Sequence, residues 1–300
     1  MKDCKPFVKW VGGKTQLLKN IENSLPSDFA KQKNISYIEP FVGGGAVLFW
    51  MLQNFPNIHR AVINDINPDL TGAYLTIKQS PRELIEILAY KEAKYFELML
   101  EDERKEFFLE QRTLYNESCI NLIERTALFI FLNRTCFNGL YRVNKKGKFN
   151  VPFGRYANPK ICDSQTILAD SELLQRVEIL TGDFSRTLNY ASQDSFFYFD
   201  PPYKPISKTS SFTTYSKEDF GDADQIRLGD FCKEIARGGS KFMLSNSDTS
   251  NSELHKTFFD DLYSMFKIER VQAKRMINSN AAKRGNVSEL LISNINVAVL

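Results

Sequence analysis

The tetrapeptide Asp200-Pro201-Pro202-Tyr203 directly follows a short apolar run, residues 195–199. That run is rich in aromatic residues and has no helical period, so it predicts a buried strand. The tetrapeptide then stands at the carboxyl end of a central strand, where open α/β sheets place their chemistry. A carboxylate and a backbone carbonyl there can accept the two hydrogens of a flat amine, while the aromatic ring stacks on its plane and the prolines fix the turn. A proline-rich turn with an incidental aspartate is the alternative.

Three consecutive glycines, Gly43-Gly44-Gly45, separate a strand expected at residues 36–39 from a helix expected at 46–54. Residues without Cβ let the backbone approach a ligand, and the helix start offers N–H groups to an anion. Asp65 ends the next expected strand, where nucleoside-binding α/β folds hold a ribose diol. The spacing is not G-x-G-x-x-G, which disfavours a dinucleotide. A ligand with a carboxylate at one end and a nucleoside at the other, such as S-adenosylmethionine, fits better than a dinucleotide. A tight turn followed by an ordinary surface aspartate is the alternative.

The segment Trp10-Val11-Gly12-Gly13-Lys14-Thr15 superficially resembles a phosphate-binding loop. That loop requires glycine at position 8, where Val8 stands, so a nucleoside triphosphatase is rejected. Lys14 can still hold a carboxylate, and Trp10 can stack on a flat group. A glycine-rich loop around a buried tryptophan is the alternative.

A third strand end carries Gly182-Asp183-Phe184. The Asp183 carboxylate can accept a hydrogen from an adenine amino group while the Phe184 ring covers the base. Aspartate and phenylalanine are common after strands, so this pattern gains weight only together with the other segments.

Two basic stretches lack any Asp or Glu, although the net charge of the chain is only +3. The first holds Arg134, Arg142, Lys145, Lys146, Lys148, Arg155 and Lys160, and the second holds Arg270, Lys274, Arg275, Lys283 and Arg284. Such stretches in a nearly neutral protein predict local contacts with a polyanion, with solvated loops as the alternative.

The first basic stretch also has the pattern of a β-hairpin over residues 135–156, with a turn signal at 144–148. Arginine pairs bidentately with guanine, asparagine pairs with adenine, and apolar groups touch the thymine methyl. The side chains expected to read bases are therefore Phe137, Asn138, Leu140, Arg142 and Pro152. Core contacts of Phe137 and Leu140 within the hairpin are the alternative.

The elements that position these residues predict one α/β domain interrupted by an insert. Residues 1–70 and 176–300 alternate strands and helices, whereas residues 71–175 are mostly helical and carry the hairpin. The five cysteines show no C-x-x-C pair, and the two histidines lie near no cysteine, so reduced thiols and no metal site are expected. The apolar runs are too short for a membrane span and no signal region is visible, so we expect a cytoplasmic protein.

Taken in order, these segments resemble the Dam-type DNA adenine N6-methyltransferases, of the alpha class of amino-methyltransferases. The pieces that carry the resemblance are Lys9-Trp10-Val11-Gly12-Gly13-Lys14, Glu39-Pro40-Phe41-Val42-Gly43-Gly44-Gly45, Asn64-Asp65-Ile66-Asn67, Phe137-Asn138-Gly139-Leu140-Tyr141-Arg142, Phe149-Asn150-Val151-Pro152-Phe153-Gly154-Arg155-Tyr156, Gly182-Asp183-Phe184 and Asp200-Pro201-Pro202-Tyr203. Residues 207–215 and Leu244-Ser245-Asn246-Ser247 also match. The ordered set is specific, although no single piece is.

The resemblance implies a Rossmann-like S-adenosylmethionine-dependent methyltransferase domain with an inserted DNA-recognition domain. The implied reaction methylates N6 of a flipped adenine in double-stranded DNA, at GATC. The implied catalytic residues are Asp200, Pro201, Pro202 and Tyr203. The implied cofactor residues are Trp10, Gly12, Lys14, Glu39, Pro40, Phe41, Gly43, Gly45, Asp65, Ile66, Asp183, Phe184 and Asp200. The implied DNA contacts are Arg134, Phe137, Asn138, Leu140, Arg142, Lys148, Pro152, Lys283 and Arg284.

Two other functions stay open on the sequence. The same pocket suits any exocyclic amine, so N4-cytosine methylation is one alternative, and a DNA-binding regulator with an inactive pocket is the other. Many relatives have tyrosine where Phe137 stands, which removes a hydrogen bond from that position but leaves stacking. The sequence leaves open the oligomeric state, and whether a restriction endonuclease acts on the same site or the enzyme acts alone.

Overall fold

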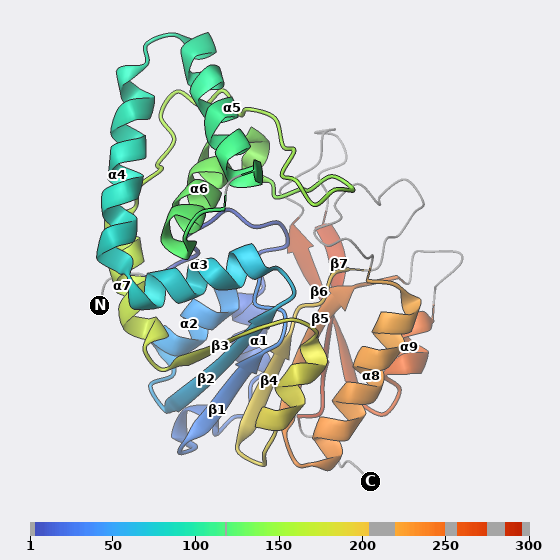
Figure 1. Cartoon of the computed structure of the whole chain (residues 1–300). Helices are drawn as coiled ribbons and strands as arrows, with labels where there is room; N and C mark the ends of the chain where they lie inside the picture. Colours follow the sequence, from blue (N-terminus) through green and yellow to red (C-terminus); the bar gives the residue numbers. More distant parts are fainter. Residues whose placement is uncertain (1–3, 118, 204–219, 250–256, 275–285, 296–300) are drawn as a thin grey trace.

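A seven-stranded sheet forms the centre of the computed structural model, which describes residues 4–117, 119–203, 220–249, 257–274 and 286–295. Its strand order is β3-β2-β1-β4-β5-β7-β6 (Figure 1). The strands are β1 (Ile35–Glu39), β2 (Ile58–Asp65), β3 (Val177–Thr181), β4 (Ser195–Phe199), β5 (Lys241–Ser247), β6 (Lys267–Lys274) and β7 (Asn286–Ser293). The first five strands run parallel, and β7 pairs antiparallel with both β5 and β6. The Rossmann-like α/β fold is confirmed, and the antiparallel pair β6 and β7 closes one edge of the sheet.

Helices cover both faces of this sheet. The α-helices are α1 (Leu18–Ser24), α2 (Ala46–Asn54), α3 (Pro68–Gln79), α4 (Pro81–Glu97), α5 (Glu101–Glu117), α6 (Leu122–Thr135), α7 (Ser164–Leu174), α8 (Asp222–Arg237) and α9 (Phe258–Leu262). Short 3-10 turns are η1 (Phe29–Lys31), η2 (Phe137–Gly139) and η3 (Phe184–Tyr190). One face packs against α1, α2, α3 and α7, and the other packs against η3, α8 and α9. The helices α4, α5 and α6 extend outward beyond α3 (Figure 1).

The central strand β4 shows why its sequence forms a buried strand. Side chains alternate between the two faces, so Phe196 and Tyr198 enter one core while Phe197 and Phe199 enter the other. All five of its residues are buried. A strand covered on both faces reads as a continuous apolar run, which is the pattern seen in the sequence.

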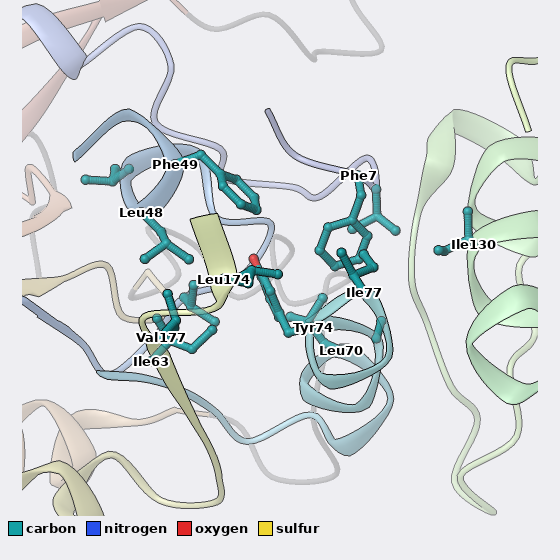
Figure 2. Close-up of a cluster of buried hydrophobic side chains, with 14 of the residues drawn as sticks. Phe7, Leu48, Phe49, Ile63, Leu70, Tyr74, Ile77, Ile130, Leu174 and Val177 are labelled. Atoms are coloured by element: carbon teal, nitrogen blue, oxygen red, sulfur yellow. The ribbon is translucent and has the colours of Figure 1, made fainter. Parts of the chain in front are cut away.

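The larger core joins the sheet layer to the helical part of the chain. Figure 2 shows Phe7 from the N-terminal segment facing Tyr74 and Ile77 of α3, with Ile130 of α6 beyond them. The rings of Phe7 and Tyr74 meet edge to face, with their centroids 4.9 Å apart. This shared core fixes α3 and α6 relative to the strands.

The segment expected as a hairpin turns back at Asn144–Lys148, but it holds only two isolated bridges, Cys136 with Phe153 and Val143 with Phe149. Backbone bonds still link the two arms, such as those from the Asn150 N–H to the Arg142 carbonyl and from the Gly154 N–H to the Thr135 carbonyl, and α5 adds side-chain bonds to them. The Asn116 amide donates to the Phe149 carbonyl and accepts from the Phe149 N–H. Backbone groups satisfied in this way need no second strand.

Asn133 of α6 joins the N-terminal segment to η2. Its buried amide donates to the carbonyls of Lys9 (2.8 Å) and Gly139 (2.9 Å), and its oxygen accepts from the Lys9 N–H (2.8 Å). The three bonds hold the loop before Trp10 beside the segment expected to read bases.

Replacing Asn133 by alanine should therefore lower the free energy of unfolding by about 1–3 kcal/mol, because it leaves buried backbone groups without hydrogen-bond partners. Urea denaturation measures the loss. The control is Asn54→Ala, since the exposed Asn54 only bonds the Trp50 carbonyl within its own helix. Equal stability of the two variants would contradict the anchoring role of Asn133.

Candidate active site

The carboxyl ends of the parallel strands bring the predicted acidic residues to one edge of the sheet. Glu39 ends β1, Asp65 ends β2, Asp183 follows β3 and Asp200 follows β4. Strands of one direction end at the same edge, which explains why residues far apart in sequence meet here.

Asp200, which is half-buried, forms an ion pair with the buried Lys14. The Lys14 Nζ lies 2.9 Å from the Asp200 Oδ1, and only 6% of the lysine side chain is exposed. The same Nζ donates to the Gly12 carbonyl at 2.8 Å, and the Ser245 hydroxyl donates to the Asp200 Oδ1 at 3.1 Å. Burial raises the pKa of Asp200, while the Lys14 ammonium and the Ser245 hydroxyl lower it. The glycine-rich loop thus delivers a cation to the strand end and does not form a phosphate loop.

Tyr203 lies on the other side of this cation. Its ring centroid is 4.3 Å from the Lys14 Nζ, and its hydroxyl donates to Glu289 of β7 at 2.7 Å. Pro201 is buried and Pro202 is exposed. The four residues therefore form a rigid corner with a carboxylate and an aromatic ring directed at one lysine.

Buried amides on the neighbouring elements support this corner. The Gln225 amide of α8 donates to the Pro202 carbonyl at 3.2 Å. The Asn246 amide of β5 donates in turn to the Gln225 Oε1 at 3.1 Å. Both Gln225 and Asn246 are fully buried, so the tetrapeptide is attached to α8 and β5 as well as to its own strand.

The glycine turn is packed too tightly for side chains. Gly45 has φ +78°, and a Cβ there would lie 2.4 Å from the Tyr74 hydroxyl. A Cβ on Gly44 would lie 2.9 Å from the Trp10 Cβ, and one on Gly43 would lie 3.0 Å from the indole. Trp10 therefore forms a wall of this turn.

Asp65 fixes the same turn from the next strand. Its carboxylate accepts from the Gly43 N–H at 3.1 Å and from the Asn67 N–H at 2.9 Å. Burial raises the pKa of Asp65 to about 6. The Asn64 amide donates to the carbonyls of Pro40 and Gly182, at 3.0 and 2.9 Å. Three strand ends are thus joined around the turn.

A second buried acid lies under the turn. The Tyr37 hydroxyl donates to the Glu39 Oε2 at 2.6 Å, and Glu39 is only 2% exposed. Burial raises the pKa of Glu39, and the nearby Asp200 adds to this effect, whereas the Tyr37 hydroxyl opposes it.

An aromatic group borders the site beside β3. The Phe184 ring lies 5.4 Å from that of Phe41 and 6.2 Å from that of Phe220. Asp183 caps η3 by accepting from the Ser185 N–H at 3.0 Å, and it pairs with Arg227 of α8 at 2.9 Å. Ile66 stands 60% exposed after β2. A nucleoside would find apolar rings and the exposed Ile66 here, together with the carboxylates of Asp65 and Asp183.

The residues expected to read bases form an exposed group. Phe137 is 50% exposed, and its N–H donates to the Pro152 carbonyl. Asn138 and Pro152 are exposed and Leu140 is half-buried. The Arg142 guanidinium is held by the Asn150 side chain and carbonyl, at 2.7 and 3.1 Å.

Other residues expected to contact DNA have partners within the protein. Arg134 is half-buried and donates to the Phe7 carbonyl at 2.6 Å. Burial lowers the pKa of Arg134. Lys148 pairs with Glu117 at 3.2 Å. Lys283, Arg284 and residues 207–215 lie outside the described residues.

Sequence reasoning missed three polar supports of the site. Ser245 belongs to a segment that only the family resemblance singled out. It lies beside Asp200 because β5 runs parallel to β4, so both strands end at the same edge of the sheet. Gln225 sits on a helix with no local signal. Glu289 reaches Tyr203 through the pairing of β7 with β5, where it lies opposite Ser247.

Comparison with known proteins gives the family. The model of the D12 class N6 adenine-specific DNA methyltransferases matches residues 10–277. A type II methyltransferase of Methanocaldococcus jannaschii is 50% identical and covers 97% of this chain and 99% of its own. A type II methyltransferase of Lactococcus lactis subsp. cremoris is 38% identical, over 97% of this chain and 96% of the relative. A DNA adenine methylase of Vibrio cholerae serotype O1 is 36% identical and also covers 97% and 96%.

The family model covers strands β1 to β6 and the helices between them, and it includes the glycine turn and the Asp200 corner. No helix within the described ranges is long and apolar enough to cross a membrane. The chain is therefore an enzyme and belongs to the D12 class of N6 adenine-specific DNA methyltransferases.

Proposed function

We propose that this enzyme uses S-adenosylmethionine to methylate a flipped adenine within GATC in double-stranded DNA. The observation that carries the proposal is the half-buried Asp200 carboxylate, paired with a lysine whose ammonium also lies over the Tyr203 ring. A carboxylate and an aromatic ring at one point match the edge and the face of adenine.

The residues around the glycine turn fit the methyl donor. The turn excludes even a Cβ at Gly45, so its backbone can approach a ligand. We assign the ribose to Asp65, the adenine ring to Ile66 and Phe184 with Asp183, and the amino acid end to the lysine side of the pocket beside Gly12 and Glu39. When bound, this donor supplies a methyl group activated by positive charge.

The catalytic work of the chain is to position the amine. Hydrogen bonds from adenine N6 to Asp200 and to the Pro201 carbonyl would turn the nitrogen lone pair out of the ring plane. A preorganised acceptor of this kind lowers the barrier without a covalent enzyme intermediate. The Lys14 ammonium occupies the Asp200 oxygen in this structure, so the base must share or displace that contact.

A base inside a duplex cannot reach such a corner, which supports base flipping. Unstacking costs a few kcal/mol, and stacking on Tyr203 can recover about 1–3 kcal/mol of it. The exposed group around Phe137 and Arg142 supports duplex reading by the insert, which we place at residues 71–175. The GATC site rests on the sequence resemblance. The type II names of two relatives support a restriction endonuclease as partner.

Asp200→Ala should abolish methylation of a GATC duplex while leaving DNA binding measurable, because it removes the acceptor and not the reading surface. Transfer of labelled methyl groups gives the rate, and identification of the modified base separates adenine N6 from cytosine N4. Asp194→Ala is the matched control, since this exposed aspartate lies at the opposite end of β4. Turnover near the wild-type rate in Asp200→Ala would remove the mechanism.

Lys14→Met should move the acidic limb of the pH profile to higher pH. Without the ammonium, the pKa of Asp200 rises further, so the carboxylate is protonated at a pH where the wild type is ionised. Loss of a close opposite charge shifts a pKa by about 1–3 units. The measurement is kcat/KM for DNA against pH at saturating donor. The exposed Lys19 provides the control Lys19→Met. A variant that is slower at every pH by the same factor would contradict the electrostatic role.

Arg142→Ala should relax the preference at one position of the site by about 1–3 kcal/mol. Rates on all single-base variants of GATC measure this discrimination. Unchanged discrimination in Arg142→Ala would show that this segment does not read bases.

Lys148→Ala should instead weaken binding to every DNA sequence and reduce the salt dependence of binding.

A further inference from the structure

We infer that Tyr141 is a positioning residue that couples recognition of the DNA site to the methyl-donor pocket, through its bond to Asp69 and its contact with Trp10. The inference rests on the proposed function. Tyr141 lies between Leu140 and Arg142 in the segment that we expect to read bases, and it is buried, so it cannot read a base itself.

Asp69 is attached to the donor pocket through its backbone. It lies in the first turn of α3, and its N–H donates to the Asn67 side chain at 3.0 Å. The Asn67 N–H donates to Asp65, which also accepts from the Gly43 N–H in the glycine turn. A movement of Asp69 is therefore passed to Asp65, which lies only four residues earlier in the chain.

The side chain of Asp69 joins three elements of the helical part of the chain. Its Oδ2 accepts from the hydroxyls of Tyr115 on α5, at 2.5 Å, and Tyr141, at 3.0 Å. Its Oδ1 accepts from the Arg125 Nε of α6 at 2.6 Å. The Arg125 guanidinium also lies 4.5 Å from the Tyr115 ring centroid. Burial raises the pKa of Tyr141, so its hydroxyl keeps its proton and remains a donor.

The ring of Tyr141 contacts the opposite wall of the pocket. It stacks on Trp10 with centroids 5.6 Å apart and planes at 30°. Trp10 in turn packs against Gly43 and Gly44, where added Cβ atoms would clash with it. Tyr141 thus touches both structures that shape the glycine turn: Trp10 through its ring, and the Asp65 loop through its hydroxyl and Asp69.

The arrangement predicts reciprocal coupling. When a duplex holds Leu140 and Arg142 in place, it also fixes Tyr141 and so orders both walls of the pocket. Two ligands that favour the same arrangement must each tighten the binding of the other by the same factor. Arg125 alone already neutralises Asp69, so the Tyr141 hydroxyl can be removed without leaving a buried charge unpaired.

The experiment measures S-adenosylhomocysteine binding by calorimetry, with and without a GATC duplex. In the wild type the duplex should tighten binding about fivefold or more, which is the lower range of typical coupling. Tyr141→Phe keeps the ring and removes the bond to Asp69. It should bind the ligand alone like the wild type but lose most of the tightening, to less than about twofold. Asp69→Asn tests the same link from the other end.

Tyr115→Phe is the matched control, because it removes a hydroxyl from the same Asp69 oxygen but has no contact with Trp10 among the described contacts. It should keep the wild-type coupling. Wild-type coupling in Tyr141→Phe, equal loss in Tyr115→Phe, or no coupling in the wild type would each overturn the inference. Methyl transfer by the wild type is measured separately, so a failed coupling with intact adenine methylation leaves the proposed function standing.

Discussion

The structure depends on the Asp200 carboxylate at the end of β4, of which only 20% is exposed, and on the buried lysine that compensates its charge. A carboxylate removed from water is unfavourable unless a cation and hydrogen bonds replace the lost solvent. Lys14 and Ser245 supply both to Asp200. Removing one partner of such a pair lowers the stability by more than the pair contributes, because the remaining charge is left without a partner. The N-terminal loop is therefore tied to the end of β4, although strands β1 to β4 and the helical part of the chain separate Lys14 from Asp200 in sequence.

The sheet explains how distant segments build one pocket. Its parallel strands end at the same edge, so the glycine turn, Asp65, Asp183 and Asp200 meet without long connections. The helical part then reaches this edge from one side, through α3 and the Asp69 contacts. The segment proposed to read bases thus contacts both Asp69 and Trp10, beside the pocket proposed for the methyl donor.

The Asp200 corner and the glycine turn could be predicted because their signals are local. The first is an apolar strand followed by Asp200, and the second is a run of glycines followed by a helix. The supporting contacts of Glu289 and Gln225 could not, because they depend on strand pairing and helix placement. Counting charges predicted a DNA contact for Arg134, but a count does not reveal that its guanidinium bonds the Phe7 carbonyl. The hairpin pattern predicted the turn at 144–148 but not the bonds that Asn116 of α5 makes to the backbone of Phe149.

The most direct test is a crystal structure of the enzyme with S-adenosylhomocysteine and a GATC duplex. We predict an extrahelical adenine with N6 at hydrogen-bonding distance from the Asp200 carboxylate, its ring on Tyr203, and Lys14 moved from its present contact. An adenine bound elsewhere, with the Lys14–Asp200 pair intact, would contradict the central role given to this carboxylate.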